Sequence, residues 1–258
     1  MTQTPQTSKA PSGTQAIDRA LAVLSSFVAH PEQGISDIAA RTELSPSTVH
    51  RIVRALVLAG YVVQASESDL YRFGPAAVVL GQSARDTLGF SVAMPLLKQL
   101  GGETGESVNM GILDGHEVVV ILRVESVQPL RFDQPTGTRI RMHCSSMGKS
   151  LLAFSDEVST GDLSLDPVGP GTITDRSALE EDLSEIRGRG FALDHEESLP
   201  GLSCVGAPVL DGNGRAVAAI AVQGPTVRMT TERMAHLGRR LTEVANAISD
   251  AMHLRDHQ

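Results

Sequence analysis

The chain has 258 residues, of which 41% are hydrophobic and 20% charged, and its formal net charge is −8. This length allows one large domain or two smaller ones, each with its own core. No apolar run is long enough to span a membrane, and the N-terminus lacks the apolar core of a signal peptide, so we expect a cytoplasmic protein without a membrane partner. Two cysteines and scattered histidines exclude a disulfide framework and predict no metal site or other cofactor.

The negative charge is unevenly distributed. Residues 1–74 carry six basic and six acidic side chains, so the whole excess of −8 falls on residues 75–258. An acidic second part repels DNA at long range, which favours a dimer that spreads its DNA contacts over two half-sites.

Residues 1–13 are polar and rich in Pro, Ser and Thr, which predicts a disordered tail. A helix is predicted from about residue 14 to 28, because four apolar side chains recur at helical spacing: Ile17, Leu21, Leu24 and Val28. We expect this helix to pack behind the two that follow.

Residues 34–61 read as a helix-turn-helix. Ser36 is the expected N-cap of the first helix, and Glu43 lies in the turn, where a left-handed conformation would cost Glu about a kcal/mol. Ser45 followed by Pro46 is a strong start signal for the second helix, which Gly60 is expected to end. One face of that helix is apolar, with Val49, Ile52, Val53 and Leu56.

The polar face of the second helix and its surroundings are the candidate DNA-binding surface. The residues expected to contact DNA are Ser36, Ser45, Ser47, Thr48, His50, Arg51 and Arg54. A plain helical hairpin would also expose a polar face. DNA binding is favoured because small and apolar residues recur at the spacing of a helix-turn-helix: Ile38, Ala39, Leu44, Val49 and Ile52.

A hairpin is predicted after Tyr61, with strands at residues 62–64 and 70–73 around a polar tip. Such a hairpin beside the second helix would be a wing and would complete a winged helix-turn-helix domain over residues 14–74. On it, Arg72 either touches DNA or is a solvated strand residue.

Residues 75–89 are interpreted as a linker helix, and a further helix is expected over residues 90–101. Beyond these the periodicity changes to two, typical of strands. Strands are expected at residues 107–113 and 117–123 around an Asp114-Gly115 turn, and near residues 130–132 and 140–144. A helical pattern resumes at Ser146 and residues 155–172 are irregular.

A capping box, Ser177 to Glu180, is expected to open a helix that runs to about Arg189. Two strands near residues 203–210 and 216–222 and a last helix over residues 231–254 complete the chain. Residues 90–258 therefore predict an α+β domain, an antiparallel sheet with helices on its faces.

The C-terminal half carries a signature that resembles the IclR family of bacterial transcriptional regulators. The matching residues are Gly190, Asp194, Glu197, Cys204, Val205, Gly206, Val209 and Asp211, and only Leu210 departs from the pattern. The resemblance covers the chain from about Gln15 to its end. It implies a sequence-specific regulator, most often a repressor of a neighbouring catabolic operon, that binds double-stranded operator DNA and assembles as a homodimer or homotetramer.

The resemblance also implies a GAF-like effector-binding and oligomerisation domain whose ligand is a small organic acid. Its pocket would contain Phe132, Ser146, Met147, Asp194, Leu202, Cys204, Ala221 and Gln223. The start of the helix at Ser146 can bind an anion, or it can be only a tight turn. Asp194 is either a ligand contact or a solvated turn residue, and Cys204 either a ligand contact or a small buried group.

This pocket departs from members that respond to two- or three-carbon acids, which have two hydroxyl residues where Ala221 and Gln223 stand here. Met147 is also larger than the residue usual at its position. The departure predicts an aromatic acid or amide-like effector.

Two other functions fit parts of the sequence. Cys204, with His195 as base, could serve a cysteine-dependent enzyme, although no oxyanion-hole motif accompanies them. Alternatively, the chain is an interaction module whose winged helix no longer reads DNA. The resemblance favours a regulator that is not an enzyme.

Overall fold

The computed structural model describes residues 14–66 and 68–256, so the tail predicted to be disordered, residues 1–13, lies outside the described residues. The chain divides between Leu88 and Gly89 into two compact units. Within the described residues, no helix is long and apolar enough to cross a membrane.

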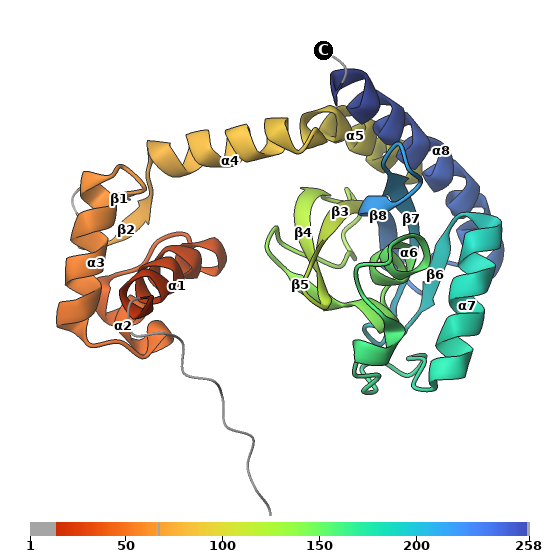
Figure 1. Cartoon of the computed structure of the whole chain (residues 1–258), viewed down its shortest axis with the longest axis horizontal. Coiled ribbons are helices and arrows are strands. Elements are labelled where there is room, and N and C mark those ends of the chain that lie inside the picture. Colours follow the sequence, from red (N-terminus) through yellow and green to blue (C-terminus); the bar gives the residue numbers. More distant parts are fainter. Residues whose placement is uncertain (1–13, 67, 257–258) are drawn as a thin grey trace, which may run out of the picture. The chain divides into compact units, whose positions relative to one another are not determined.

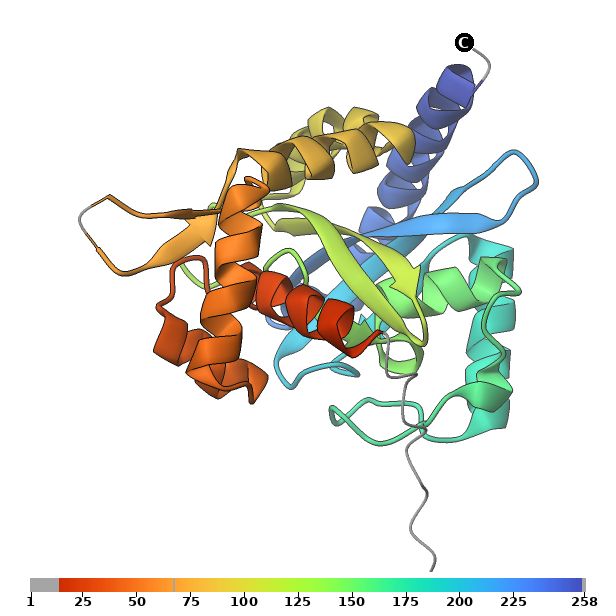
Figure 2. The same ribbon diagram turned by 60° about the vertical axis from the view of Figure 1, so that its left-hand side comes forward.

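The first unit contains the predicted winged helix-turn-helix. Its elements are α1 (Gln15–Ala29), α2 (Ile35–Thr42), α3 (Pro46–Leu58), β1 (Val62–Gln64), β2 (Tyr71–Phe73) and α4 (Pro75–Thr87). The first three helices pack around one small core, and β1 pairs antiparallel with β2 beside α3 (Figure 2). This core is formed by Val23, Phe27, Ile38, Ala39, Val49, Val53 and Val62.

The start of α2 differs from the prediction. Gly34, not Ser36, is the N-cap, and Ser36 lies in the first turn. The helix starts two residues before the expected position, so Asp37 is its third residue, and the Asp37 carboxylate accepts a hydrogen bond from the Gly34 N–H at 3.2 Å. A carboxylate at this position also suits the positive end of the helix dipole.

The turn into α3 follows the sequence signals. Glu43 adopts φ 55° and ψ 30°, the left-handed conformation expected to cost a residue other than glycine about 1 kcal/mol. Ser45 caps α3, and its Oγ accepts a hydrogen bond from the Thr48 N–H at 3.3 Å. At the other end of α3, Gly60 has φ 77°, a left-handed conformation that ends the helix before the hairpin begins.

Ser45→Ala is expected to lower the free energy of unfolding of the first unit by about 1 kcal/mol, because the Thr48 N–H loses its capping acceptor. Urea unfolding followed by circular dichroism measures the change. Ser36→Ala is the matched control and should have little effect, since Ser36 is exposed and caps nothing. Equal losses in both variants would contradict the assignment of the caps.

The second unit is a six-stranded antiparallel sheet between two layers of helices (Figure 1). The strand order is β5-β4-β3-β8-β7-β6. The strands are β3 (Ser107–Asp114), β4 (Glu117–Val124), β5 (Arg139–Arg141), β6 (Ala192–His195), β7 (Leu202–Leu210) and β8 (Ala216–Pro225). One face packs against α5 (Ala93–Thr104) and α8 (Thr231–Asp256), and the other against α6 (Ser146–Phe154) and α7 (Arg176–Arg189). Short 3-10 helices lie at Phe90–Val92, Met142–Cys144 and Thr160–Asp162.

Side chains alternate between these two layers, except at irregularities next to Met110 in β3 and Val209 in β7. On β8, Ala218, Ile220 and Val222 enter the core under α5 and α8, while Ala219 and Ala221 pack in the core under α6 and α7. The partners of β8 in β3 and β7 follow the same alternation through their register. Between these irregularities, the strand position of a residue shows whether it faces α6.

One strand prediction was wrong, and another was only partly correct. Residues 130–132 lie in the connection between β4 and β5, residues 125–138, which we call the strap. At Leu130 the carbonyl accepts a 2.9 Å hydrogen bond from the Arg228 side chain, and residues 130–132 pair with no neighbouring strand. The strand expected at residues 140–144 is short, because the 3-10 turn at Met142–Cys144 follows β5 directly.

Three local details also differ. Asp114 pairs with Glu117, so the β3–β4 loop is Gly115-His116, one residue later than predicted. Asp175, which accepts the Ala178 N–H at 3.0 Å, caps α7 in place of the predicted Ser177 capping box. The edge strand β6 was not predicted.

Candidate functional site

The exposed face of α3 carries a stripe of polar side chains. Ser47 and Arg54 each lie three or four residues from the adjacent pair His50 and Arg51, and all four side chains are exposed. The opposite face is fixed in the core by Val49 and Val53, which are buried. Burial of the apolar face therefore determines which side chains α3 presents to a partner.

Some polar groups of this stripe form hydrogen bonds within the described part of the protein, and others form none. Ser45 Oγ lies 2.8 Å from Thr48 Oγ1 and 3.1 Å from Ser47 Oγ, so these hydroxyls form a small cap network. No described residue forms a hydrogen bond or ion pair with the guanidinium groups of Arg51 and Arg54. Two free cations on an exposed helix are suited to phosphate oxygens and to base edges.

The remaining predicted DNA contacts lie on neighbouring elements. Ser36 is exposed in the first turn of α2, and Arg72 is exposed on β2. Arg72 lies 4.0 Å from Glu32, at the limit of an ion pair between two well-solvated groups, which holds the arginine only weakly. Both are accessible to a partner that contacts α3.

The second unit has a row of polar side chains across its sheet. Ser107 of β3 pairs with Gln223 of β8, Gln223 with Cys204 of β7, and Cys204 with Asp194 of β6. Residues paired across strands share a face, and this face is the one that packs against α6. All four side chains are buried. The row brings together three of the predicted effector contacts, Gln223, Cys204 and Asp194.

The start of α6 lies against the same face. Ser145 caps the helix by accepting the Gly148 N–H at 3.1 Å, while the N–H groups of Ser146 and Met147 lie in the first turn and have no acceptor within the helix. The contact with the sheet is close: a Cβ on Gly206 would lie 2.6 Å from the carbonyl carbon of Ser146. Only glycine allows this approach, which places both predicted residues, Ser146 and Met147, beside the row.

The strap covers one end of the polar row, at Ser107 of β3 and Gln223 of β8. Ser107, Asn109, Phe132, Gln134 and Gln223 line a narrow cleft, together with Arg123, Val124, Glu125 and Asp133. The Asn109 side chain donates a hydrogen bond to Gln134 Oε1 at 2.9 Å. The buried Gln223 Nε2 has no hydrogen-bond partner among the described residues.

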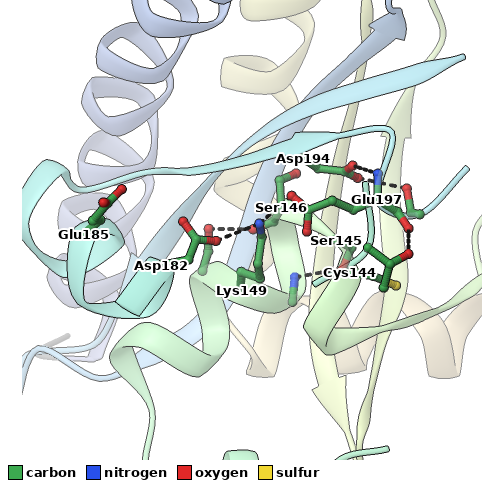
Figure 3. Close-up of polar contacts among 12 residues, drawn as sticks. Cys144, Ser145, Ser146, Lys149, Asp182, Glu185, Asp194 and Glu197 are labelled. Carbon is green, nitrogen blue, oxygen red and sulfur yellow. Dashed lines mark hydrogen bonds and ion pairs between the residues drawn. The ribbon is translucent and has the colours of Figure 1, made fainter. Parts of the chain in front are cut away.

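A buried charge cluster flanks the other end of the row (Figure 3). Lys149 of α6 is only 1% exposed, and its Nζ lies 2.6 Å from Glu197 and 2.8 Å from Asp182. Burial lowers the pKa of Lys149, but the two carboxylates outweigh it and raise the pKa, so the lysine is charged. Burial raises the pKa of Glu197 to about 7, against the opposing effect of Lys149.

Asp194 is fully buried, so the alternative of a solvated turn residue is wrong. Its carboxylate accepts the Glu197 N–H and the Ser198 hydroxyl, both at 2.8 Å. Burial raises the pKa of Asp194, although these hydrogen bonds oppose the shift. Asp194 therefore holds the turn that carries Glu197, in addition to its place in the polar row.

The arrangement does not support a cysteine nucleophile. Burial, with Asp194 nearby, raises the pKa of the Cys204 thiol well above its ordinary value, and a thiol that stays protonated is a poor nucleophile. His195 is exposed, and it pairs with Ser203, so it lies on the face of the sheet opposite to Cys204. Burial also raises the pKa of Cys144, to about 12. Among the described residues, no cluster of His, Cys, Asp and Glu could hold a metal ion.

Several residues of this site were not predicted from the sequence: Ser107, Asn109, Gln134, Lys149 and Asp182. Ser107 and Asn109 had a signal, because they are polar residues at alternate positions of a strand that is otherwise apolar. The partners of Lys149 are distant in sequence, and Glu197 is 48 residues away.

Comparison with known proteins agrees with this architecture. Residues 16–66 match the IclR helix-turn-helix domain, and residues 82–250 match the bacterial transcriptional regulator IclR C-terminal domain. The chain is 37% identical over 245 residues to the HTH-type transcriptional regulator BhcR of Paracoccus denitrificans, an alignment covering 93% of this chain and 88% of that protein. It is 33% identical over 256 residues to the HTH-type transcriptional repressor AllR of Escherichia coli strain K12, covering 95% and 93% of the two chains.

Among solved structures, the IclR protein of Thermotoga maritima superposes with a TM-score of 0.74 at 29% identity, covering 93% of this chain and 99% of that one. The two domain matches together span most of the chain, and the named relatives are regulators. The chain therefore belongs to the IclR family of bacterial transcriptional regulators, with an N-terminal helix-turn-helix and a C-terminal effector-binding domain, and it is not an enzyme.

Proposed function

We propose that this regulator represses a neighbouring catabolic operon by placing α3 in the major groove of its operator. An aromatic or amide-like carboxylate bound in the second unit would change the occupancy of that operator. The observation that carries the DNA-binding part is the pair of free, exposed guanidinium groups of Arg51 and Arg54 on a helix whose other face is locked in the core.

Each part of the DNA-binding domain would make a different kind of contact with DNA. Arg51, Arg54 and His50 on α3 would reach base edges or phosphates, and the hydroxyls near the start of α3 would bind the backbone. Ser36 and Arg72 would position the domain from α2 and the wing. The cap network of Ser45, Ser47 and Thr48 would have to exchange some of its internal hydrogen bonds for phosphate contacts.

We further propose that the DNA-binding units pair as a homodimer, from which a homotetramer can be built. Large apolar side chains remain more than half exposed on α1 and α4: Ile17, Leu21, Val28, Val78, Val79 and Leu80. Several of them line an apolar cleft between these helices. A contiguous apolar surface of this kind marks an interaction site. It supports a second copy as partner, and α4 would then serve as both dimer contact and linker helix.

The effector site supports an acid of moderate size. Its carboxylate would lie at the start of α6, where the N–H groups of Ser146 and Met147 and the helix dipole favour an anion. Ala221 and Phe132 supply apolar surface beside the cleft, with Leu202 and Cys204 in the adjacent strand β7. Gln223 adds one amide in place of hydroxyl groups.

Isothermal titration calorimetry tests this effector class directly. Aromatic carboxylates are expected to bind more tightly than glyoxylate or pyruvate, because a two- or three-carbon acid leaves the apolar surface without a partner. Each acid that binds should also change operator occupancy in a gel-shift titration. Tighter binding of glyoxylate or pyruvate than of every aromatic acid in the panel would overturn the proposed effector class.

A further inference from the structure

The end of the effector site under the strap is strongly polar. Ser107 and Asn109 on β3 and Gln223 on β8 are buried on the face of the sheet toward α6, and Gln134 covers them from the strap. Ser107 Oγ donates to the Phe132 carbonyl at 3.4 Å, and Asn109 Nδ2 donates to Gln134 Oε1 at 2.9 Å. We call Ser107, Asn109, Gln134 and Gln223 the amide end of the site.

One donor in the amide end has no acceptor. Gln223 is 3% exposed and its Nε2 forms no hydrogen bond with a described residue. Buried amide groups in folded proteins almost always have a partner, so an unpaired one beside a cleft is a candidate contact for a bound molecule. Gln134 accepts from Asn109 through its Oε1, which leaves its Nε2 as a second donor lining the same cleft.

The register of the sheet fixes the distance from the amide end to the start of α6. Asn109, Ala221 and Gly206 are successive partners across β3, β8 and β7, and Ser146 packs directly on Gly206. Neighbouring strands lie about 4.8 Å apart, so Gly206 and Asn109 are separated by roughly 10 Å. A molecule bound at the start of α6 that crosses Ala221 therefore ends beside Asn109.

We infer that the amide end selects effectors with an oxygen acceptor at the end remote from their carboxylate. This inference rests on the proposed function, because it needs the carboxylate at the start of α6. Gln223 Nε2 donates to the acceptor oxygen, and the hydrogen bond from Asn109 orients Gln134 to donate a second time. The effector class is then a carboxylate with a remote carbonyl or similar oxygen, and Asn109 and Gln134 are specificity-determining residues.

Two ligands of the same shape test the inference: 4-acetylbenzoate, which has the remote acceptor, and 4-isopropenylbenzoate, which lacks it. Calorimetry is the suitable method because the chain contains no tryptophan for fluorescence. The full-length protein is expected to bind the acetyl compound about fivefold more tightly, the effect of one added hydrogen bond. Gln223→Leu should remove much of this preference, because only the second donor, Gln134, remains. Gln99→Leu makes the same change on the exposed surface of α5 and should keep it.

Gln134→Leu provides a second variant if Gln223→Leu does not fold, because Gln134 is only half-buried on the strap. It is expected to reduce the preference by at least half. Equal affinities of the wild type for the two ligands, with both binding, would overturn this inference and leave the proposed aromatic-acid function standing. Failure of both ligands and of benzoate to bind, while pyruvate binds, would overturn the proposed effector class and the inference with it.

Discussion

Arg51→Ala is expected to weaken operator binding by about 1–3 kcal/mol per subunit if the guanidinium reads a base edge. If Arg51 holds a phosphate, affinity falls on all DNA sequences and the dependence on salt becomes shallower by about one unit of slope. The physical reason is the same in both cases, because Arg51 is a free cation on the exposed face of α3. Fluorescence anisotropy with labelled operator, measured across a range of salt concentrations, separates the two outcomes.

The matched control is Arg85→Ala, which removes the same charge from the exposed surface of α4. It should alter the affinity for the operator far less, because it changes only the long-range electrostatic attraction to DNA and removes no contact made by α3. Unchanged affinity of Arg51→Ala for every promoter fragment would contradict DNA recognition by α3. Such a result would favour the alternative of an interaction module that no longer reads DNA.

Lys149→Met is expected to have the largest effect on stability, a loss of about 3–5 kcal/mol, because it leaves the buried Glu197 without its cation. The effect depends on pH. Burial has already raised the pKa of Glu197 to about 7, and loss of the lysine raises it further. At pH 6 the carboxyl group is mostly protonated and needs no cation, so the loss should be smaller there than at pH 8. Urea unfolding at the two pH values measures both quantities.

Two further variants test the cause of this loss. Lys149→Met combined with Glu197→Gln removes both charges and should recover much of the stability, while Asp182 keeps its ion pair with Arg189 at 3.2 Å. Lys98→Met makes the same change at an exposed position of α5 and should cost little. If Lys149→Met were as mild as Lys98→Met at pH 8, the buried cluster would not support the fold as described.

The sequence predicted the first unit well because its signals are local. Ser45 and Pro46 mark the start of α3, Gly60 marks its end, and the apolar period between them leaves one helix face for the core. Each of these signals acts within a few residues, so no knowledge of the rest of the chain is needed. The caps of α2 and α7 were missed because several residues near each helix start can serve as caps.

The second unit was predicted less completely, since its site depends on contacts between distant segments. The order of strands places Asp194, Cys204, Gln223 and Ser107 in one row, and that order is a property of the folded sheet. Residues 130–132 of the strap resemble a strand in composition but do not pair with a neighbouring strand. The position of Lys149 between Glu197 and Asp182 likewise appears only after α6 and α7 have packed on the sheet.

The most direct test of the account is a gel-shift titration of the purified protein on the DNA upstream of its own gene and the adjacent operon, with and without aromatic carboxylates. We predict a specific shift that competitor DNA of unrelated sequence does not remove, that Arg51→Ala weakens, and whose midpoint an effector moves. Absence of a specific shift on any of this DNA at low salt would contradict the central claim that α3 reads an operator.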